Sequence, residues 1–240
     1  MENEINYHNI DHLLDQIPDN FQILEETINI DVQKQYIESS QKLELNGDLV
    51  NVDEQIAIVE NPDSDDEEIK IALQNLAFTD AIEAFRAIES YTKTAPDHLK
   101  DWATLALQQS RILIHASLLD EQQFFISSGL GGKKDKLRYF FIFPFANNLN
   151  ITDFQRNSFE KELNYFLEKY DSILEDLNFE EKFATVTALV PLKSSVADIV
   201  NSLINECKNY GNYLSDNAII TNIKKFNTEE ITEIIENNEE

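Results

Sequence analysis

Cysteine, glycine and proline are scarce in this sequence, and acidic residues far outnumber basic ones. There is one cysteine among 240 residues, so no disulfide can form within the chain. No apolar run approaches the roughly 18 residues that a membrane-spanning helix needs, and the first residues lack the basic and apolar regions of a secretory signal. Together these absences predict a cytoplasmic protein without a membrane segment.

The sequence also lacks recognisable catalytic, metal and cofactor patterns. His115 lies in an apolar segment with no evident nucleophile or carboxylate partner, which indicates a buried or half-buried histidine. Cys207 falls on the apolar stripe of a predicted helix, which indicates packing. His8 and His12 could share a helical face, but a zinc site needs further ligands that the nearby sequence does not offer. We therefore predict no enzyme activity, no metal and no cofactor.

The negative charge is concentrated at the two ends of the chain. The formal net charge is −26, from 19 basic and 45 acidic residues. Residues 1–68 carry 19 acidic and 2 basic side chains, residues 228–240 carry 6 and none, and residues 69–227 carry 20 and 17. Segregated acidic ends are typical of interaction arms or solubilising tails, and the C-terminal tail is expected to be a short helix or disordered. Direct nucleic-acid binding is disfavoured, because phosphate contacts need clustered lysine and arginine.

The stretch from residue 122 to 145 organises the rest of the chain. Two aromatic and β-branched runs, Phe124–Ile126 and Leu137–Phe143, flank a segment rich in glycine and lysine. Such runs favour strands and glycines permit turns, so the pattern predicts a β-hairpin with a flexible, basic tip. The second run is almost continuously apolar, which predicts a central strand covered on both faces.

The tip of this hairpin is the candidate binding site for a ligand or partner. Glycine backbone beside lysine can hold a phosphate, although GLGGKKDK does not match the P-loop pattern and lies between strands. A solvated loop tip explains the composition equally well, and the basic tip could instead dock one of the chain's own acidic ends. The candidate residues are Gly129, Gly131, Gly132, Lys133, Lys134, Lys136 and Arg138.

Residues 1–62 are predicted to form an acidic N-terminal arm. Apolar spacing predicts a short amphipathic helix over 5–17 and another short piece after it. Residues 42–52 alternate apolar and polar side chains around Asn46-Gly47, which predicts a hairpin with a type I′ turn. Such short elements are marginal alone, so we expect them to dock on the body of the protein or on a partner.

The segment 63–120 is predicted to be helical. Ser64 followed by Glu67 has the pattern of a capping box and predicts the start of the first helix. Two more helices follow, and the last is apolar around much of its circumference, which predicts a buried helix.

Residues 121–227 are predicted to form an α/β sandwich. After the hairpin we expect a helix over 152–177, a strand over 183–192, a helix that begins at Ser195, and a strand over 217–226. The order hairpin-α-β-α-β predicts an α+β protein, in which the N-terminal helical part packs with an open mixed sheet, ferredoxin-like in outline. Such a topology implies no function.

The leading hypothesis is a cytosolic, non-enzymatic interaction or adaptor protein that docks a basic protein partner through its acidic terminal arms. One alternative is a regulatory domain that senses a small anionic ligand at the basic hairpin tip. Another alternative is an acidic inhibitor or immunity protein of a basic toxin. An exposed strand edge could also pair with a second copy of the chain to give a homodimer.

Overall fold

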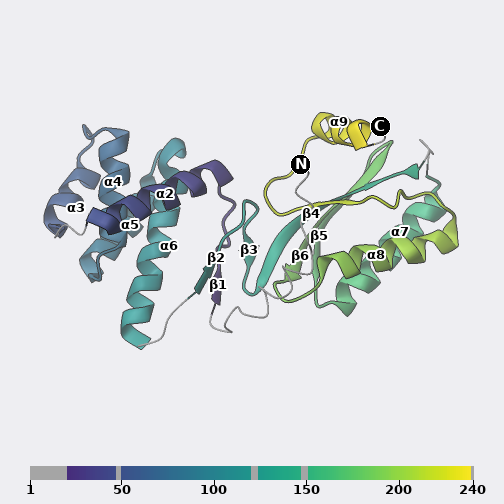
Figure 1. The fold of residues 1–240 in the computed structure, drawn as a ribbon, viewed down its shortest axis with the longest axis horizontal. Coiled ribbons are helices and arrows are strands. Elements are labelled where there is room, and N and C mark those ends of the chain that lie inside the picture. Colours follow the sequence, from purple (N-terminus) through teal and green to yellow (C-terminus); the bar gives the residue numbers. More distant parts are fainter. Residues whose placement is uncertain (1–20, 47–49, 120–123, 147–150, 239–240) are drawn as a thin grey trace. The chain divides into compact units, whose positions relative to one another are not determined.

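The protein divides into two compact units, each with its own hydrophobic core. The computed structural model (Figure 1) describes residues 21–46, 50–119, 124–146 and 151–238. Among the described residues, a helical unit comprises residues 21–24 and Ile28–Ile126, and a sheet unit comprises Glu25–Thr27 and the residues from Ser127 onward. Helices and an antiparallel sheet confirm the predicted α+β class. None of the helices in these ranges combines the length and apolar character needed to cross a membrane.

The helical unit consists mainly of packed helices. Its described residues form α2 (Ile30–Asn46), α3 (Val52–Glu60), α4 (Asp66–Ala77), α5 (Ile82–Thr94) and α6 (Asp97–Leu119). Two short strands, β1 (Phe21–Ile23) and β2 (Phe124–Ile126), pair in parallel. The type I′ hairpin predicted over 42–52 is wrong, because the residues of its first strand continue α2 to Asn46. An asparagine–glycine pair suits the end of a helix as well as a hairpin turn.

Part of the predicted acidic arm belongs to the core of the helical unit. Leu24, Ile28 and Tyr36 are buried in one cluster with residues of α4, α5 and α6. Gln74, which is fully buried, joins α4 to α2: its Nε2 donates to the Tyr36 carbonyl at 2.9 Å and its Oε1 accepts from Ser39 Oγ at 2.7 Å. These residues dock on the body of the protein, as their short length requires. The helix predicted over 5–17 lies outside the described residues.

The predicted capping box is displaced by one residue. Asp65 is the N-cap of α4: its Oδ1 accepts from the Glu68 N–H at 2.8 Å, while the Asp65 N–H donates to Glu68 Oε2 at 3.2 Å. Ser64 Oγ instead donates to the Ile58 carbonyl at 2.8 Å. Both Ser64 and Asp65 are good N-cap residues, and Ser64 closes the turn that follows α3.

The sheet unit is built on β4 (Lys136–Pro144), which runs between β6 (Phe183–Pro191) on one side and β3 (Gly132–Lys133) and β7 (Ile219–Thr221) on the other. Strand β5 (Ile173–Phe179) lies beyond β6, and every pairing in this sheet is antiparallel. The predicted mixed sheet is therefore wrong. The element order β4, α7, β5, β6, α8, β7 agrees with a ferredoxin-like outline, which stays a prediction at that level of detail.

The missed strand β5 explains that error. The helix predicted over 152–177 ends earlier, since α7 covers Asp153–Lys169. Asp171 adopts a left-handed φ of 51°, and the Ser172 N–H donates back to the Leu167 carbonyl at 2.7 Å. Glycine or asparagine usually marks such a helix end, so an aspartate gave no signal that the chain turns here into a strand.

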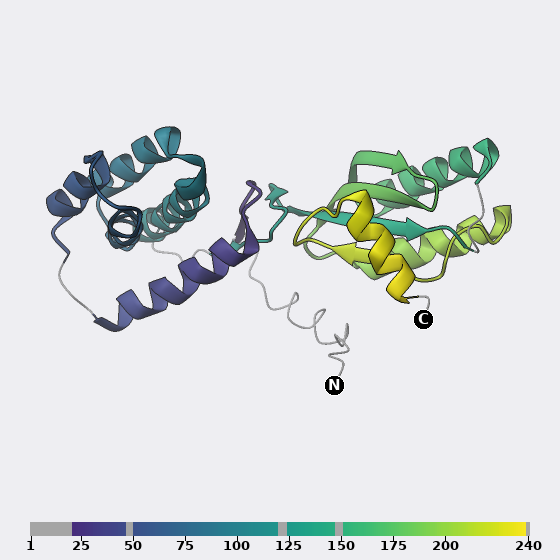
Figure 2. The same cartoon turned by 90° about the horizontal axis from the view of Figure 1, so that it is seen from above.

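Helices cover both faces of the sheet. Helices α7 and α8 (Val196–Cys207) lie on one face, while α9 (Thr228–Asn238) lies across the other (Figures 1 and 2). Along β4, Phe141 and Phe143 belong to the core with α7 and α8, whereas Phe140 and Ile142 belong to a smaller cluster with α9. This confirms the prediction of a central strand covered on both faces. The last predicted strand shrinks to β7, and the predicted tail contains the helix α9.

Candidate functional site

The glycine–lysine segment is a packed junction in the sheet unit. The predicted pairing of Phe124–Ile126 with Leu137–Phe143 is wrong, because Phe124–Ile126 pairs with β1 in the helical unit. A shorter hairpin forms instead, in which β3 pairs with the start of β4 and Lys134 lies at the turn with a φ of 57°. The residues before β3 are therefore not part of this hairpin and contact other segments of the chain.

Two of the candidate glycines make room for backbone from distant segments. A Cβ on Gly129 would lie 1.8 Å from the Ile223 carbonyl oxygen, and a Cβ on Gly131 would lie 2.4 Å from the Glu25 carbonyl oxygen. Gly131 also has a φ of 67°, which L-residues rarely adopt. The glycines thus serve close packing at positions where the composition had suggested a ligand loop.

The segment between Gly129 and Lys134 holds a short piece of the acidic N-terminal part. The Gly132 N–H donates to the Glu25 carbonyl at 3.4 Å, and the Lys134 N–H donates to Glu25 Oε1 at 3.2 Å. Thr27 Oγ1 donates to the Leu130 carbonyl at 3.4 Å. These hydrogen bonds favour the intramolecular alternative, in which the basic segment docks the chain's own acidic residues.

Arg138, a candidate ligand-binding cation, is engaged within the fold. Its Nε and Nη2 donate to the two carboxylate oxygens of Glu175 at 2.5 and 2.9 Å, and its Nη1 donates to the Leu130 carbonyl at 2.7 Å. A bidentate guanidinium–carboxylate pair fixes both side chains. Arg138 therefore connects β4 to the edge strand β5 and to the glycine segment.

Lys136 is engaged in the same way, whereas the two preceding lysines are open to solvent. Lys136 Nζ donates to the Asp171 carboxylate at 2.6 Å and to the Asp171 carbonyl at 2.5 Å, and the Lys136 side chain is 12% exposed. Lys133 and Lys134 are exposed. Of the four predicted cations, Lys133 and Lys134 are thus the ones placed to meet a ligand.

Cations from three separate parts of the unit act on Glu175. The hydrogen bond from Arg138 holds the pKa of Glu175 below its usual range against the opposing effect of burial, and Lys225 and Lys133 lower it further. The same pairing raises the pKa of Arg138, with a contribution from Glu25. Sequence reasoning missed Glu175 and Lys225, because only the bulged edge strand and the segment after β7 bring them to Arg138.

This pairing predicts a specific loss of stability in acid. Because folding lowers the pKa of Glu175, the unfolded state binds the proton more readily as the pH falls. The contribution of the pair is therefore complete above the ordinary carboxyl pKa of about 4.3 and is lost as the pH falls through the lower, folded-state value. We expect the difference in unfolding free energy between the wild type and Glu175→Gln to shrink between pH 6 and pH 3, measured by urea denaturation.

The same substitution at the exposed Glu160 is the matched control. Because this side chain is exposed, the variant should keep the unfolding free energy of the wild type at pH 6. A Glu175→Gln profile parallel to that of the wild type would contradict the assignment.

The other residues considered from sequence do not assemble a reactive site. His115 is exposed, which corrects the prediction of a buried or half-buried position, because α6 continues beyond the core of the helical unit. His8 and His12 lie outside the described residues. In the part of the chain that the structure describes, no group of three or more histidine, cysteine, aspartate or glutamate side chains is placed to hold a metal ion.

Cys207 is buried as predicted, in the core between the sheet, α7 and α8. Burial raises the pKa of its thiol to about 11, although a hydrogen bond with Tyr213 lowers it in part. Since the thiolate is the reactive form, we expect iodoacetamide to label the native chain slowly at pH 7.5 and the urea-unfolded chain rapidly, as followed by mass spectrometry. Labelling at equal rates in both states would contradict this prediction.

Comparisons with known proteins identify no family for this chain. No protein-family model matches it, and no curated protein matches its sequence. A solved structure described as "a putative transposase from Deinococcus radiodurans R1" aligns with 44% of this chain and 93% of that chain, at 14% identity and a TM-score of 0.38. A likeness of this degree supports no inference about function.

Proposed function

We propose that this chain is a cytosolic, non-enzymatic interaction protein that docks a basic protein partner through acidic side chains carried on folded helices. The observation that supports this proposal is the arrangement of α9. Ile231 is buried against the sheet, whereas Glu229 and Glu233, one turn apart, are exposed. The acidic residues predicted as a tail are thus held at fixed positions, where they can steer and orient a basic surface.

The helical unit offers a second set of acidic side chains, but these also serve the fold. Asp66 and Glu67 lie in the first turn of α4, where carboxylates interact favourably with the helix dipole. Asp66 Oδ2 lies 3.1 Å from His98 Nε2, and Glu67 Oε1 lies 2.6 Å from Lys70 Nζ. Helix α9 is therefore the better place to test a docking role.

The test compares paired neutralising substitutions on two helices of the full-length protein. Glu229→Gln/Glu233→Gln removes two charges from α9, and Glu160→Gln/Glu168→Gln removes two exposed charges from α7. Each protein is used as bait in native lysate, with quantitative mass spectrometry of captured proteins. We expect the α9 variant to lose a basic protein that the wild type and the α7 variant retain. Equal capture by all three, or a retained protein that is not basic, would overturn the proposal.

Point substitutions are preferable here to removal of the N-terminal arm. Deleting residues 1–60 would take Leu24, Ile28 and Tyr36 out of the core of the helical unit. A loss of capture would then report unfolding.

A small anionic ligand is the alternative that one observation favours. Lys133 and Lys225 are exposed and both act on the Glu175 carboxylate, so an anion beside them would meet two cations. The test is thermal stabilisation by a panel of phosphorylated ligands, for the wild type against Lys133→Ala/Lys225→Ala. A shift in the wild type that the variant loses would favour this alternative, and no shift with any ligand would count against it. The inhibitor alternative would use the same α9 surface, and capture of a basic toxin would identify it.

A further inference from the structure

The face of the sheet opposite α7 and α8 carries a small apolar surface on which α9 is seated (Figures 1 and 2). Four buried residues form its floor, and we call them the α9 patch: Leu130, Phe140, Ile142 and Phe183. Ile231 of α9 is buried with them, and Ile235, one turn further along, packs against the cluster. The isoleucines of α9 at i and i+4 therefore face the patch.

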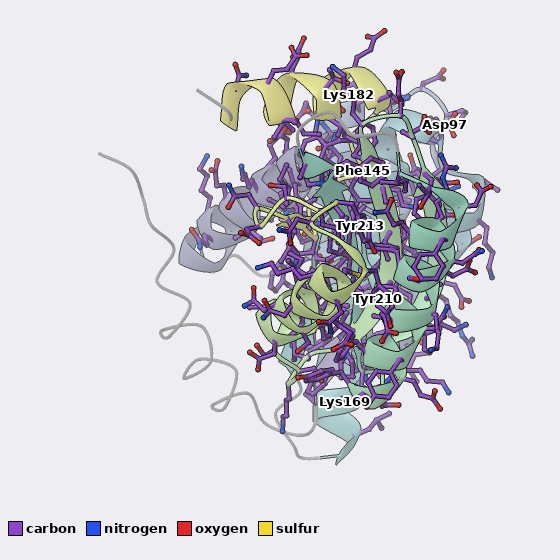
Figure 3. The ribbon with its side chains drawn as sticks, turned by 90° about the vertical axis from the view of Figure 1, so that its right-hand side faces the viewer. Asp97, Phe145, Lys169, Lys182, Tyr210 and Tyr213 are labelled. Carbon is purple, nitrogen blue, oxygen red and sulfur yellow. The ribbon has the colours of Figure 1, made fainter. Side chains whose placement is uncertain are left out.

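An ion pair also joins α9 to the rest of the sheet unit. Lys182, whose label overlies α9 in Figure 3, places its Nζ 3.5 Å from Glu236 Oε1, and both side chains remain about half exposed, at 46% and 63%. An exposed ion pair of this kind contributes little to stability. The seating of α9 thus depends mainly on Ile231 and Ile235.

The hydrogen bonds at the N-terminus of α9, in contrast, are formed by residues that are close to it in the sequence. The Asn227 N–H donates to Glu230 Oε2 at 2.9 Å, and the Glu230 N–H donates to Asn227 Oδ1 at 2.9 Å. Lys224 Nζ also donates to Glu230 Oε1 at 2.6 Å. These contacts would stay with α9 if it left the sheet, so departure exposes the α9 patch without breaking the helix cap.

We propose that the α9 patch is an exchangeable docking site for an acidic amphipathic helix, with α9 as its resident occupant. The patch supplies an apolar floor for isoleucines at i and i+4, and Lys182 supplies a cation for a carboxylate at i+5. A partner helix with this pattern binds by the helix-in-groove mode once α9 vacates the patch. This surface lies beneath α9 and differs from the outward Glu229 and Glu233, so the inference does not depend on the proposed function.

Covalent connection sets how strongly α9 competes with such a helix. A short linker gives a tethered helix an effective concentration in the millimolar range. If the free helix binds with a dissociation constant near 0.1 mM, the resident α9 weakens the apparent affinity on the order of tenfold. Removing Ile231, the residue that anchors α9, should therefore raise the apparent affinity for a free helix by that factor.

The experiment uses a fluorescein-labelled synthetic peptide of residues 222–238 as the probe and full-length chains as receptors. Fluorescence anisotropy compares the wild type with Ile231→Asp, which removes the anchor, and with Ile234→Asp, which changes a half-buried position on the same helix outside the cluster. We expect the peptide to bind the Ile231→Asp chain on the order of tenfold more tightly than the wild type. The Ile234→Asp chain should resemble the wild type, and a peptide carrying Ile231→Asp should bind none of them.

Two results would overturn the inference: no peptide binding to an Ile231→Asp chain that keeps the far-UV circular dichroism of the wild type, or equal binding to the Ile231→Asp and wild-type chains. If Ile231→Asp does not fold, Ile235→Asp decides the question, because Ile235 also packs against the cluster. The Ile235→Asp chain should then bind the natural peptide more tightly than the wild type does, and equal binding would overturn the inference. Neither result bears on capture through Glu229 and Glu233, which is tested separately.

Discussion

Gly129→Ala is expected to destabilise the sheet unit by about 3 kcal/mol, at the upper end of overpacking effects. A Cβ at this position would lie 1.8 Å from the carbonyl oxygen of Ile223 and 2.7 Å from its carbonyl carbon. Both are backbone atoms, which cannot rotate away as a flexible side chain can. The adjacent Leu130 N–H donates to the Asn222 carbonyl at 2.9 Å, so separating the two segments would also break this hydrogen bond.

Urea denaturation followed by far-UV circular dichroism measures this effect, with Lys134→Gly as the matched control. Lys134 lies in the same segment with a φ of 57°, a conformation that glycine adopts freely. The control should change the unfolding free energy by less than about 1 kcal/mol. The flexible tip expected from composition would tolerate both substitutions equally, so a Gly129→Ala chain as stable as Lys134→Gly would contradict the packed junction.

Strong local patterns in the sequence predicted several elements of the sheet unit correctly. The apolar run that became β4 needed burial on both faces, and the structure provides it. Thr152 caps α7 and Ser195 caps α8, with their hydroxyls accepting from the N–H groups of Gln155 at 3.3 Å and Asp198 at 3.2 Å. Helix caps and apolar stripes are formed by residues that are close together in the sequence, so they can be recognised from the sequence alone.

The errors arose where distant residues decided the outcome. Phe124–Ile126 has the composition of a strand, but nothing local reveals that its partner is Phe21–Ile23, about a hundred residues earlier. Distant residues also decided how the candidate site is arranged. Arg138 was recognised as a cation, while its partner Glu175 belongs to a strand whose start is marked only by a left-handed aspartate at position 171. Composition showed which groups could bind an anion but not which of them the fold already uses.

Phe159→Ala is the second substitution expected to have a large effect. Phe159 of α7 is fully buried and makes edge-to-face contacts with Phe143 of β4 and Phe179 of β5, at centroid distances of 5.3 and 5.7 Å. Removing a buried phenylalanine ring leaves a cavity and typically costs 3–5 kcal/mol. Since a domain of this size is stable by about 5–15 kcal/mol, the variant should lose a large share of its stability, or unfold, in the urea titration.

Phe154→Ala is the natural control, because Phe154 lies on the same helix but is 64% exposed. Its ring touches Tyr210 at a centroid distance of 6.0 Å, an edge-to-face contact worth about 0.5–1.5 kcal/mol, so we expect a loss of no more than about 1.5 kcal/mol. Comparable losses for the two variants would mean that Phe159 is not central to the core.

The pair of variants also separates the stability of the sheet from peptide binding, because β4 carries the α7–α8 core on one face and the α9 patch on the other. A helix peptide that binds Ile231→Asp should therefore still bind when Phe154→Ala is added, and should lose its site when Phe159→Ala unfolds the sheet beneath it.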